Sequence, residues 1–222
     1  MAKHHPSPEL LTAFSAGSLP LSQALCVSTH IEHCSECRTN LLRLNSMGAN
    51  MMESLKPTEV SADLKNSVFA MLDDAEEDVS KAANRTTNRN SRVPRSLQQF
   101  IPNDYDDLQW HHVSPSIQTA WLCTDTNGSK VEMLRIKPGG KVPSHTHTGD
   151  EYTILLEGSF SDESGVYNEG DFVLRDGRHK HKPMVTEDRE CICLVVTDAP
   201  IAFTGFFSRW LNPFLRRNHF AH

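Results

Sequence analysis

The sequence contains no long hydrophobic run. Its longest aliphatic stretch, Ile192–Val196, is interrupted by Cys193, whereas a helix that crosses a membrane needs roughly 20 apolar residues. The first residues also lack the apolar segment of a secretory signal peptide. We therefore expect a soluble, cytoplasmic protein that has no contact with a membrane.

The absence of a secretion signal changes the meaning of the 6 cysteines. Disulfide frameworks belong to oxidising compartments, so none is expected here. Metal ligands and buried thiols are the better interpretation. The chain also has 12 histidines in 222 residues, and their spacing decides what they indicate.

Basic residues are scarce outside one short segment. The chain has a net charge of −6. Residues 80–99 contain five bases and no acid, whereas residues 1–79 have a net charge of −6. An acidic chain is a poor candidate for wrapping nucleic acid, so we expect no direct contact with DNA or RNA. A partner with a basic face fits better.

Residues 1–79 have the periodicity of helices. A first helix is expected after Pro6 and Pro8, followed by helices over about 21–30, 35–53 and 57–78. In the third helix, a 3–4 spacing of apolar residues predicts a buried stripe made of Leu41, Leu44, Gly48, Met51, Met52 and Leu55. The fourth is amphipathic through Val60, Leu64, Val68, Met71 and Leu72.

The sequence pattern changes from helical to strand-like after a polar segment. Residues 80–99 are rich in Asn, Arg, Ser and Thr, which predicts a linker. Residues 100–205 contain short strand-like runs separated by glycines, which predicts a sandwich or barrel. The aromatic tail, 206–222, is expected to pack on the barrel or to form a dimer surface. The fold class is therefore multidomain, with a small module of about four helices followed by an all-β domain.

A first set of candidate metal ligands lies in the helical half. In His30-x3-Cys34-x2-Cys37, two thiols and one imidazole can face one point, and His5 is the fourth candidate. Zinc prefers four nitrogen or sulfur ligands in a tetrahedron, and such a site would hold a small helical module together. Structural thiols are the alternative, and two neighbours compete as ligands: Cys26 and His33.

A second set lies in the β half, in Gly139-x5-His145-x-His147-x3-Glu151 and in Gly170-x10-His181. Residues two apart on a strand point to the same face, so both histidines of the first string would enter a barrel. His179 lies two residues before His181 and would share its face of the strand, so either of the two could be the fourth ligand. Three imidazoles and a carboxylate suit zinc, iron, manganese, nickel or copper.

These two strings resemble, in type and order, those of the ChrR family of anti-sigma factors, which join a zinc-binding helical module to a C-terminal cupin. The resemblance implies a helical anti-sigma domain over residues 1–79, a cupin β-barrel (jelly roll) over 100–205, and zinc in both sites. It also implies that the module grips an extracytoplasmic-function (ECF) sigma factor, with the fourth helix between the two sigma domains. The partner-binding residues are then Glu59, Asp63, Leu64, Val68, Met71 and Leu72.

The resemblance further implies regulation rather than catalysis. The sigma factor would be released on singlet-oxygen or organic peroxide stress sensed by the cupin. Oxidisable candidates are the zinc-bound thiolates, the cupin histidines, and Cys191 with Cys193, although the last two also fit simple buried thiols. The alternative is a metal-dependent, dioxygenase-like cupin with the helical module as an appendage. A homodimer through the cupin or the tail stays open.

Overall fold

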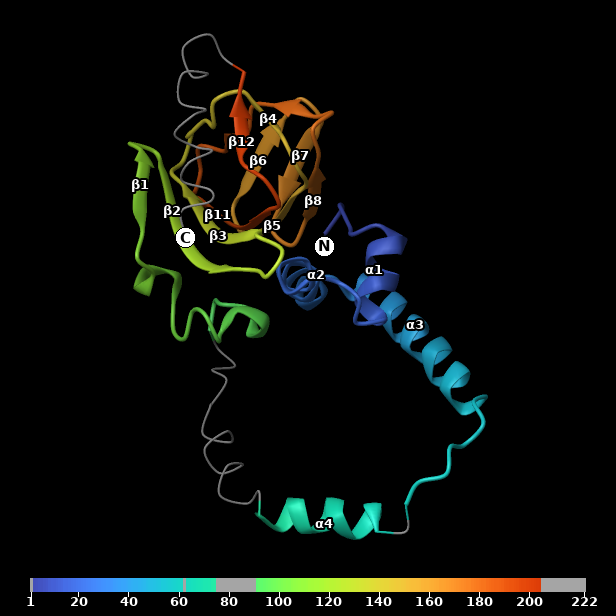
Figure 1. Cartoon of the computed structure of the whole chain (residues 1–222). Coiled ribbons are helices and arrows are strands. Elements are labelled where there is room, and N and C mark those ends of the chain that lie inside the picture. The colour runs from blue at the N-terminus through green and yellow to red at the C-terminus, as the bar shows by residue number, and fades with distance from the viewer. Residues whose placement is uncertain (1, 62, 75–90, 205–222) are drawn as a thin grey trace.

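The computed structural model describes residues 2–61, 63–74 and 91–204 (Figure 1). Four α-helices come first: α1 (Pro8–Ser15), α2 (Leu21–His33), α3 (Ser35–Glu53) and α4 (Leu64–Asp74). The predictions for the aromatic tail, for linker residues 80–90 and for the acidic residues 75–78 fall outside the described residues.

The boundaries of the first helices follow from local chemistry. Ser7 caps α1, since its Oγ accepts a hydrogen bond from the N–H of Leu10 at 3.2 Å, and Pro8 occupies the first helical position. Cys34 has extended backbone angles and separates α2 from α3, and its Sγ accepts from the N–H of Cys37 at 3.4 Å. The predicted span of the third helix is confirmed. The bend at Cys34 brings the end of α2 and the start of α3 to one point.

The second half consists of two 3₁₀ turns and twelve strands among the described residues. The turns are η1 (Arg95–Leu97) and η2 (Tyr105–Asp107). The strands are β1 (His111–Ser114), β2 (Ile117–Thr124), β3 (Lys130–Ile136), β4 (His145–His147), β5 (Glu151–Glu157), β6 (Ser159–Asp162), β7 (Gly165–Asn168), β8 (Phe172–Arg175), β9 (Lys180–His181), β10 (Met184–Val185), β11 (Cys191–Thr197) and β12 (Ile201–Phe203).

These strands form a β-sandwich. The larger sheet has the order β1-β2-β3-β11-β5-β8, and two three-stranded sheets have the orders β10-β6-β7 and β12-β4-β9. All pairings between the named strands are antiparallel. The sheets are not joined into one closed hydrogen-bonded barrel, but the predicted all-β class and its position after the helices are confirmed.

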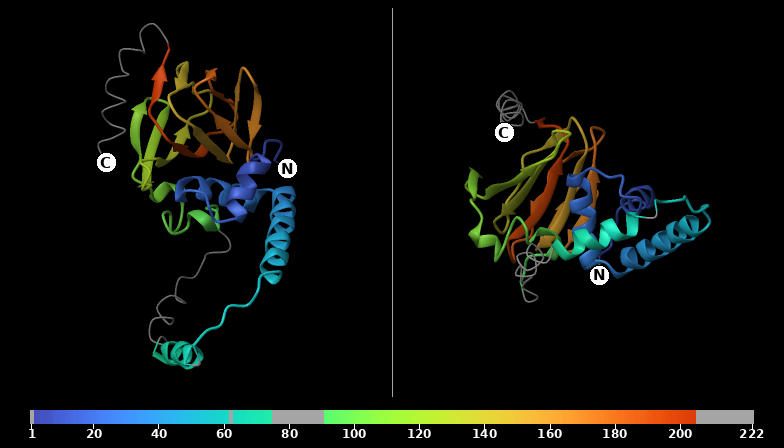
Figure 2. Two further views of the ribbon diagram at one scale, coloured as in Figure 1. Left: turned by 45° about the vertical axis from the view of Figure 1, so that its right-hand side comes forward. Right: turned by 60° about the horizontal axis from the view of Figure 1, so that its bottom comes forward.

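Helix α2 lies against the outer face of the larger sheet (Figures 1 and 2). Leu25, Cys26 and Val27 of α2 belong to the same buried cluster as Ile192 and Leu194 of β11. Alternation along β11 turns Cys191 and Cys193 to the other face, where they join the cluster inside the sandwich. The helices therefore share one core with the outer face of the larger sheet, and the inside of the sandwich holds a second core.

The predicted buried stripe of the third helix was wrong over its second half. Met51, Met52 and Leu55 are 62%, 69% and 62% exposed. α1 packs against α3, and the Oγ of Ser15 donates to Oδ1 of Asn45 near the middle of that helix. All residues of α3 after Leu44 are exposed. Periodicity identifies an apolar face but not the element that covers it, and here α3 projects beyond the rest of the molecule (Figure 2).

The fourth helix exists but does not pack on the other three. It stands apart in Figure 1 and in the left view of Figure 2, and its Val68, Met71 and Leu72 are 47%, 71% and 59% exposed. It also begins at Leu64, later than the predicted 57. The compact part of the N-terminal half is therefore α1 to α3, and α4 is an outlying apolar helix.

The end of the predicted linker is folded. Val93 and Leu97 are buried in the shared core. The carboxylate of Glu32 on α2 accepts hydrogen bonds from the N–H groups of Arg95 and Ser96 at 2.9 and 2.8 Å. These two apolar anchors and the capped turn are enough to hold residues 91–99 against α2, although the segment is polar on average.

Across the described ranges, every helix is too short or too polar to traverse a lipid bilayer.

Candidate metal centres

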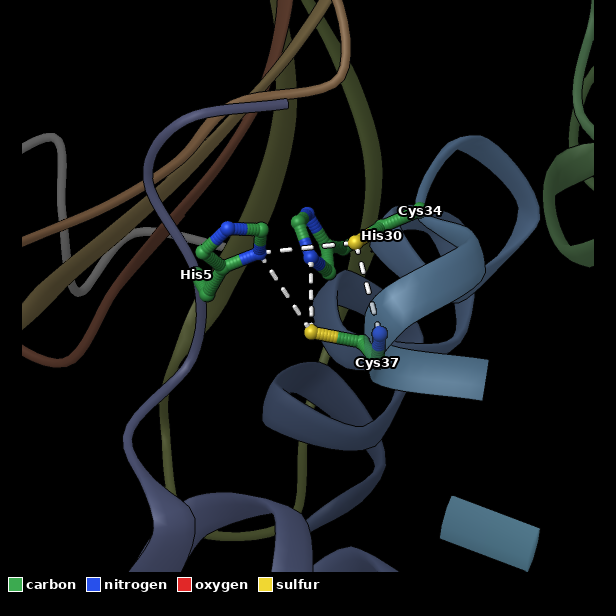
Figure 3. Close-up of side chains that lie close together, drawn as sticks. All are labelled: His5, His30, Cys34 and Cys37. Atoms are coloured by element: carbon green, nitrogen blue, oxygen red, sulfur yellow. Dashed lines mark hydrogen bonds between the residues drawn. The ribbon is translucent and has the colours of Figure 1, made fainter. Parts of the chain in front are cut away.

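The first set of predicted ligands meets at one point. His5 precedes α1, His30 lies in the last turn of α2, Cys34 is at the bend and Cys37 is in the first turn of α3. Figure 3 shows the four side chains pointing toward one another. The cluster joins three segments of the chain, which is what the sequence predicted.

The distances in this cluster fit a tetrahedral ion. Nε2 of His30 lies 3.3 Å from Sγ of Cys37. Nδ1 of His5 lies 3.4 Å from Sγ of Cys34 and 3.5 Å from Sγ of Cys37. Zinc bonds are about 2.0–2.1 Å long to nitrogen and about 2.3 Å long to sulfur. At tetrahedral angles, a nitrogen and a sulfur bound to the same zinc ion are therefore about 3.5–3.6 Å apart. Very little movement would be needed to bind the ion.

The surroundings of the cluster prepare it for a cation. Nδ1 of His30 lies 2.8 Å from the carbonyl oxygen of Gly170. A carbonyl only accepts, so Nδ1 must carry the proton and Nε2 presents its lone pair to the cluster. Burial lowers the pKa of His30 to about 4 and raises the pKa of the Cys37 thiol to about 12. Without a cation the thiol stays protonated, whereas a metal ion would favour the thiolate.

The two competing ligands are directed elsewhere. The Sγ of Cys26 lies 3.8 Å from the carbonyl oxygen of Tyr152, in the core between α2 and the sheet. His33 packs near Gly170. Among the described residues, the cluster of potential ligands at this point contains neither of them.

Three predicted ligands of the second set also converge. His145 and His147 lie on β4, and His181 lies on the neighbouring strand β9. Nε2 of His181 is 3.0 Å from Nε2 of His145 and 3.1 Å from Nε2 of His147. All three residues are buried.

The tautomers of the histidines in this cluster favour the binding of a cation. Nδ1 of His145 is 2.9 Å from the carbonyl oxygen of Pro143, and Nδ1 of His181 is 3.0 Å from the carboxylate of Asp162. Both partners accept, so both Nδ1 atoms carry the proton in neutral rings and both Nε2 atoms present lone pairs. Two lone pairs 3.0 Å apart repel each other. A metal ion between them removes this repulsion.

Glu151 does not join the three histidines in this geometry. Its carboxylate lies 3.6 Å from Nδ1 of His147, on the side of that ring away from the cluster. Burial raises the pKa of Glu151 to about 7. Reaching an ion held by the three Nε2 atoms would require a change of its side-chain rotamer.

The structure also separates His179 from His181. Nδ1 of His179 lies 2.8 Å from the carboxylate of Asp176, and its side chain is 43% exposed. Cys191 and Cys193, whose Sγ atoms are 3.5 Å apart, are buried inside the sandwich. Cys193 lies close enough to Glu151 for that charge to raise its thiol pKa further, after the larger effects of Cys191 and burial.

The residues that support the ligands could not be found from the sequence. Gly170 and Asp162 contact their histidines across 140 and 19 positions of the chain. Asp162 belongs to neither ligand string, and Gly170 belongs to the string of His181 but contacts His30 of the other cluster. Only folding brings each beside its histidine. Asp162 is held in turn by Arg175, whose guanidinium donates to it at 3.1 Å.

Known proteins resemble this chain over nearly its whole length. A family model described as the ChrR cupin-like domain matches residues 98–200. The anti-sigma-E factor ChrR of Cereibacter sphaeroides is 34% identical over 215 residues, which is 96% of this chain and 98% of that protein. The crystal structure of Rhodobacter sphaeroides SigE in complex with the anti-sigma ChrR matches with a TM-score of 0.76 and 30% identity, over 89% of this chain and 99% of that one.

Proposed function

Because this chain belongs to the ChrR family of anti-sigma factors, we propose that it sequesters an ECF sigma factor and keeps that subunit away from core RNA polymerase. The extent of the likeness carries the proposal, since it spans both the helices and the cupin. The structure that matches most of this chain is itself a complex of ChrR with SigE. Such a role places the protein in the cytoplasm, where sigma factors act.

The surface proposed for the sigma factor consists of the projecting part of α3, the segment that follows it, and α4. The exposed large apolar side chains gathered there are Met47, Met51, Met52, Leu55, Val60, Leu64, Val68, Phe69, Met71 and Leu72. Apolar side chains exposed together in this number are typical of a binding surface. Glu59 and Asp63 are exposed just before α4 and provide negative charge for a basic partner.

We propose zinc as the metal of the N-terminal cluster. Two imidazoles and two thiolates form a donor set that structural zinc sites use. An ion there would tie the segment before α1 to α2 and α3, and so fix the base from which α3 and α4 project. The cupin cluster is proposed to bind zinc as well, although three imidazoles also accept iron, manganese, nickel or copper.

We further propose that the cupin senses oxidative stress of the singlet-oxygen or organic peroxide type and that sensing releases the sigma factor. Imidazoles and thiols are both oxidisable, and both are present in the cupin. Strand β8 connects the two clusters, so a change at one could be transmitted to the other. The strand begins beside Gly170, whose carbonyl oxygen accepts a hydrogen bond from His30. It ends at Arg175, which holds Asp162 against His181.

The enzymatic alternative, a dioxygenase-like cupin, is not favoured by the relatives reported above, because they are regulators of transcription. The proposed function is tested by co-expression with an ECF sigma factor of the same organism, followed by size-exclusion chromatography and metal analysis. A one-to-one complex that contains zinc is expected. Separate elution of two well-folded proteins would contradict the proposal.

A further inference from the structure

The turn between β7 and β8 contacts the segment that carries His5. Oδ1 of Asp171 accepts hydrogen bonds from the N–H groups of Lys3 and His4, the second at 3.0 Å. The N–H of Phe172 donates to the carbonyl oxygen of His4 at 3.0 Å. Three hydrogen bonds from the cupin therefore fix the backbone immediately before His5.

The same turn contacts the second histidine of the cluster. The carbonyl oxygen of Gly170 accepts from Nδ1 of His30 at 2.8 Å. Gly170 has a φ of +86°, and a Cβ atom there would lie 3.0 Å from Cβ of His33. Glycine at this position thus permits both the turn and the close approach of α2.

Asp171 is the centre of this arrangement. It is 1% exposed, and its second carboxylate oxygen accepts from the N–H of Asn168 at 2.8 Å, which holds the turn itself in shape. Its carboxylate thus bridges the turn and the N-terminal segment, yet it does not belong to the ligand cluster. The ring of His4 also contacts that of Tyr167 on β7, with centroids 4.7 Å apart and the rings tilted by 51°.

From these contacts we propose that Asp171 is a positioning residue for the N-terminal metal site. The β7–β8 turn holds His5 through the backbone and His30 through its ring, so the affinity of the site for its metal depends on the cupin. A ligand held in place before the metal arrives loses less conformational freedom on binding, and removal of such outer support weakens metal affinity about 10-fold to 100-fold. This inference rests on the proposed metal binding at the cluster.

The test is a cobalt titration of the full-length protein, with zinc competition to obtain affinities. Of the two ligand clusters found among the described residues, the N-terminal one contains cysteine and the cupin one does not. The thiolate-to-cobalt charge-transfer band therefore reports the N-terminal site. Asp171→Ala is expected to lower its affinity about 10-fold or more. Asp171→Asn keeps an oxygen that can accept from Lys3 and His4, and is expected to recover part of the loss.

Asp125 provides the matched control. It also connects the cupin to the helices, through two hydrogen bonds to Ser22 at the start of α2. His30 lies at the opposite end of that helix, so Asp125 contacts neither a ligand nor a residue next to one. Asp125→Ala should leave the cobalt affinity within about threefold of the wild type. If Asp171→Ala does not fold, Asp171→Asn is compared with Asp125→Asn in the same way.

The outcomes separate this inference from the proposed function. If the Asp171 and Asp125 variants bind cobalt with equal affinity, Asp171 has no positioning role. The proposed metal site would still stand in that case, provided that the wild type shows a strong charge-transfer band. A wild-type protein that binds cobalt without the charge-transfer band would instead contradict the proposed metal site itself.

Discussion

The carboxylate of Asp125 accepts two hydrogen bonds from Ser22, one from the N–H and one from Oγ, each at 2.8 Å. The residue before α2 is Pro20, which offers no side-chain cap. The start of a helix leaves N–H groups without partners, and here a cupin residue 103 positions away satisfies one. Folding of α2 is thereby linked to folding of the sandwich.

Asp125→Ala should therefore lower the free energy of unfolding by about 1–2 kcal/mol, the range for loss of a helix cap. Urea unfolding followed by circular dichroism measures the change. The control is Asp188→Ala, because Asp188 is 70% exposed and its ion pair with Arg189 is long, at 4.0 Å. If both variants unfold at the wild-type midpoint, the cap does not link the helix to the sandwich.

Val68 of α4 is 47% exposed and lies on the surface proposed for the sigma factor. Val68→Asp should weaken sigma binding about 10-fold or more, as expected for a residue in the centre of an interface. Its thermal stability should stay unchanged, because the side chain is not part of the core. Calorimetric or fluorescence titration with the sigma factor measures the affinity.

Val166 of β7 offers the control for that variant. It has a similar exposure, 55%, but lies on the cupin. Val166→Asp should bind the sigma factor as the wild type does. Equal losses in both variants would indicate a nonspecific effect of the added charge and contradict the assignment of α4.

The cupin cluster should bind metal more tightly as pH rises to about 7. Burial lowers the pKa of His145 to about 4 and of His147 to about 3, so both rings are neutral well below neutrality. Burial raises the pKa of Glu151 to about 7, so this carboxyl is protonated in the metal-free protein below that pH. If it binds the ion it must lose one proton, and affinity then rises about tenfold per pH unit up to about 7.

Glu151→Gln should abolish this slope, since the amide has no proton to lose. Competition titrations between pH of about 5 and about 8, on protein that also carries Cys34→Ser and Cys37→Ser, isolate the cupin site. An unchanged slope in Glu151→Gln would show that Glu151 is not the group that loses a proton when the metal binds. Glu151 would then stay beside His147 without contacting the metal.

The double substitution His145→Ala with Glu151→Ala tests the sensing role. The sigma factor should still be bound, because the proposed docking surface on α3 and α4 is far from β4 and β5 in Figure 1. Induction of the sigma regulon by singlet oxygen or organic peroxide should be blunted. Induction equal to that of the wild type would exclude the cupin cluster as the sensor.

Both ligand clusters could be predicted because their spacing is local. Cys34-x2-Cys37 lies on one helical turn, and His145 and His147 alternate on one strand, so the geometry of the element alone brings them together. His5 was proposed from its position just before the first predicted helix, and the family resemblance supported it, since nothing local connects it to the other ligands.

The parts that the sequence did not reveal depend on tertiary contacts. The exposed face of α3 and the isolated position of α4 depend on which elements cover an apolar stripe, and periodicity does not contain that information. The folding of residues 91–99 depends on Glu32 of α2, 63 positions before Arg95. The side chain of Glu151 lies on the outer side of His147, although its sequence position fits a fourth ligand.

The central claim is that a metal ion at His5, His30, Cys34 and Cys37 shapes the helices that capture a sigma factor. The most direct measurement is the affinity of the full-length protein for that sigma factor, before and after metal removal by a chelator and in the Cys34→Ser, Cys37→Ser variant. His179→Ala serves as the control, since its exposed side chain lies outside both clusters. We predict that affinity falls about 100-fold or more without the metal, returns when zinc is added back to the wild type, and is unchanged in His179→Ala. A stripped or thiol-free protein that still folds and binds the sigma factor as tightly as the wild type would contradict the account.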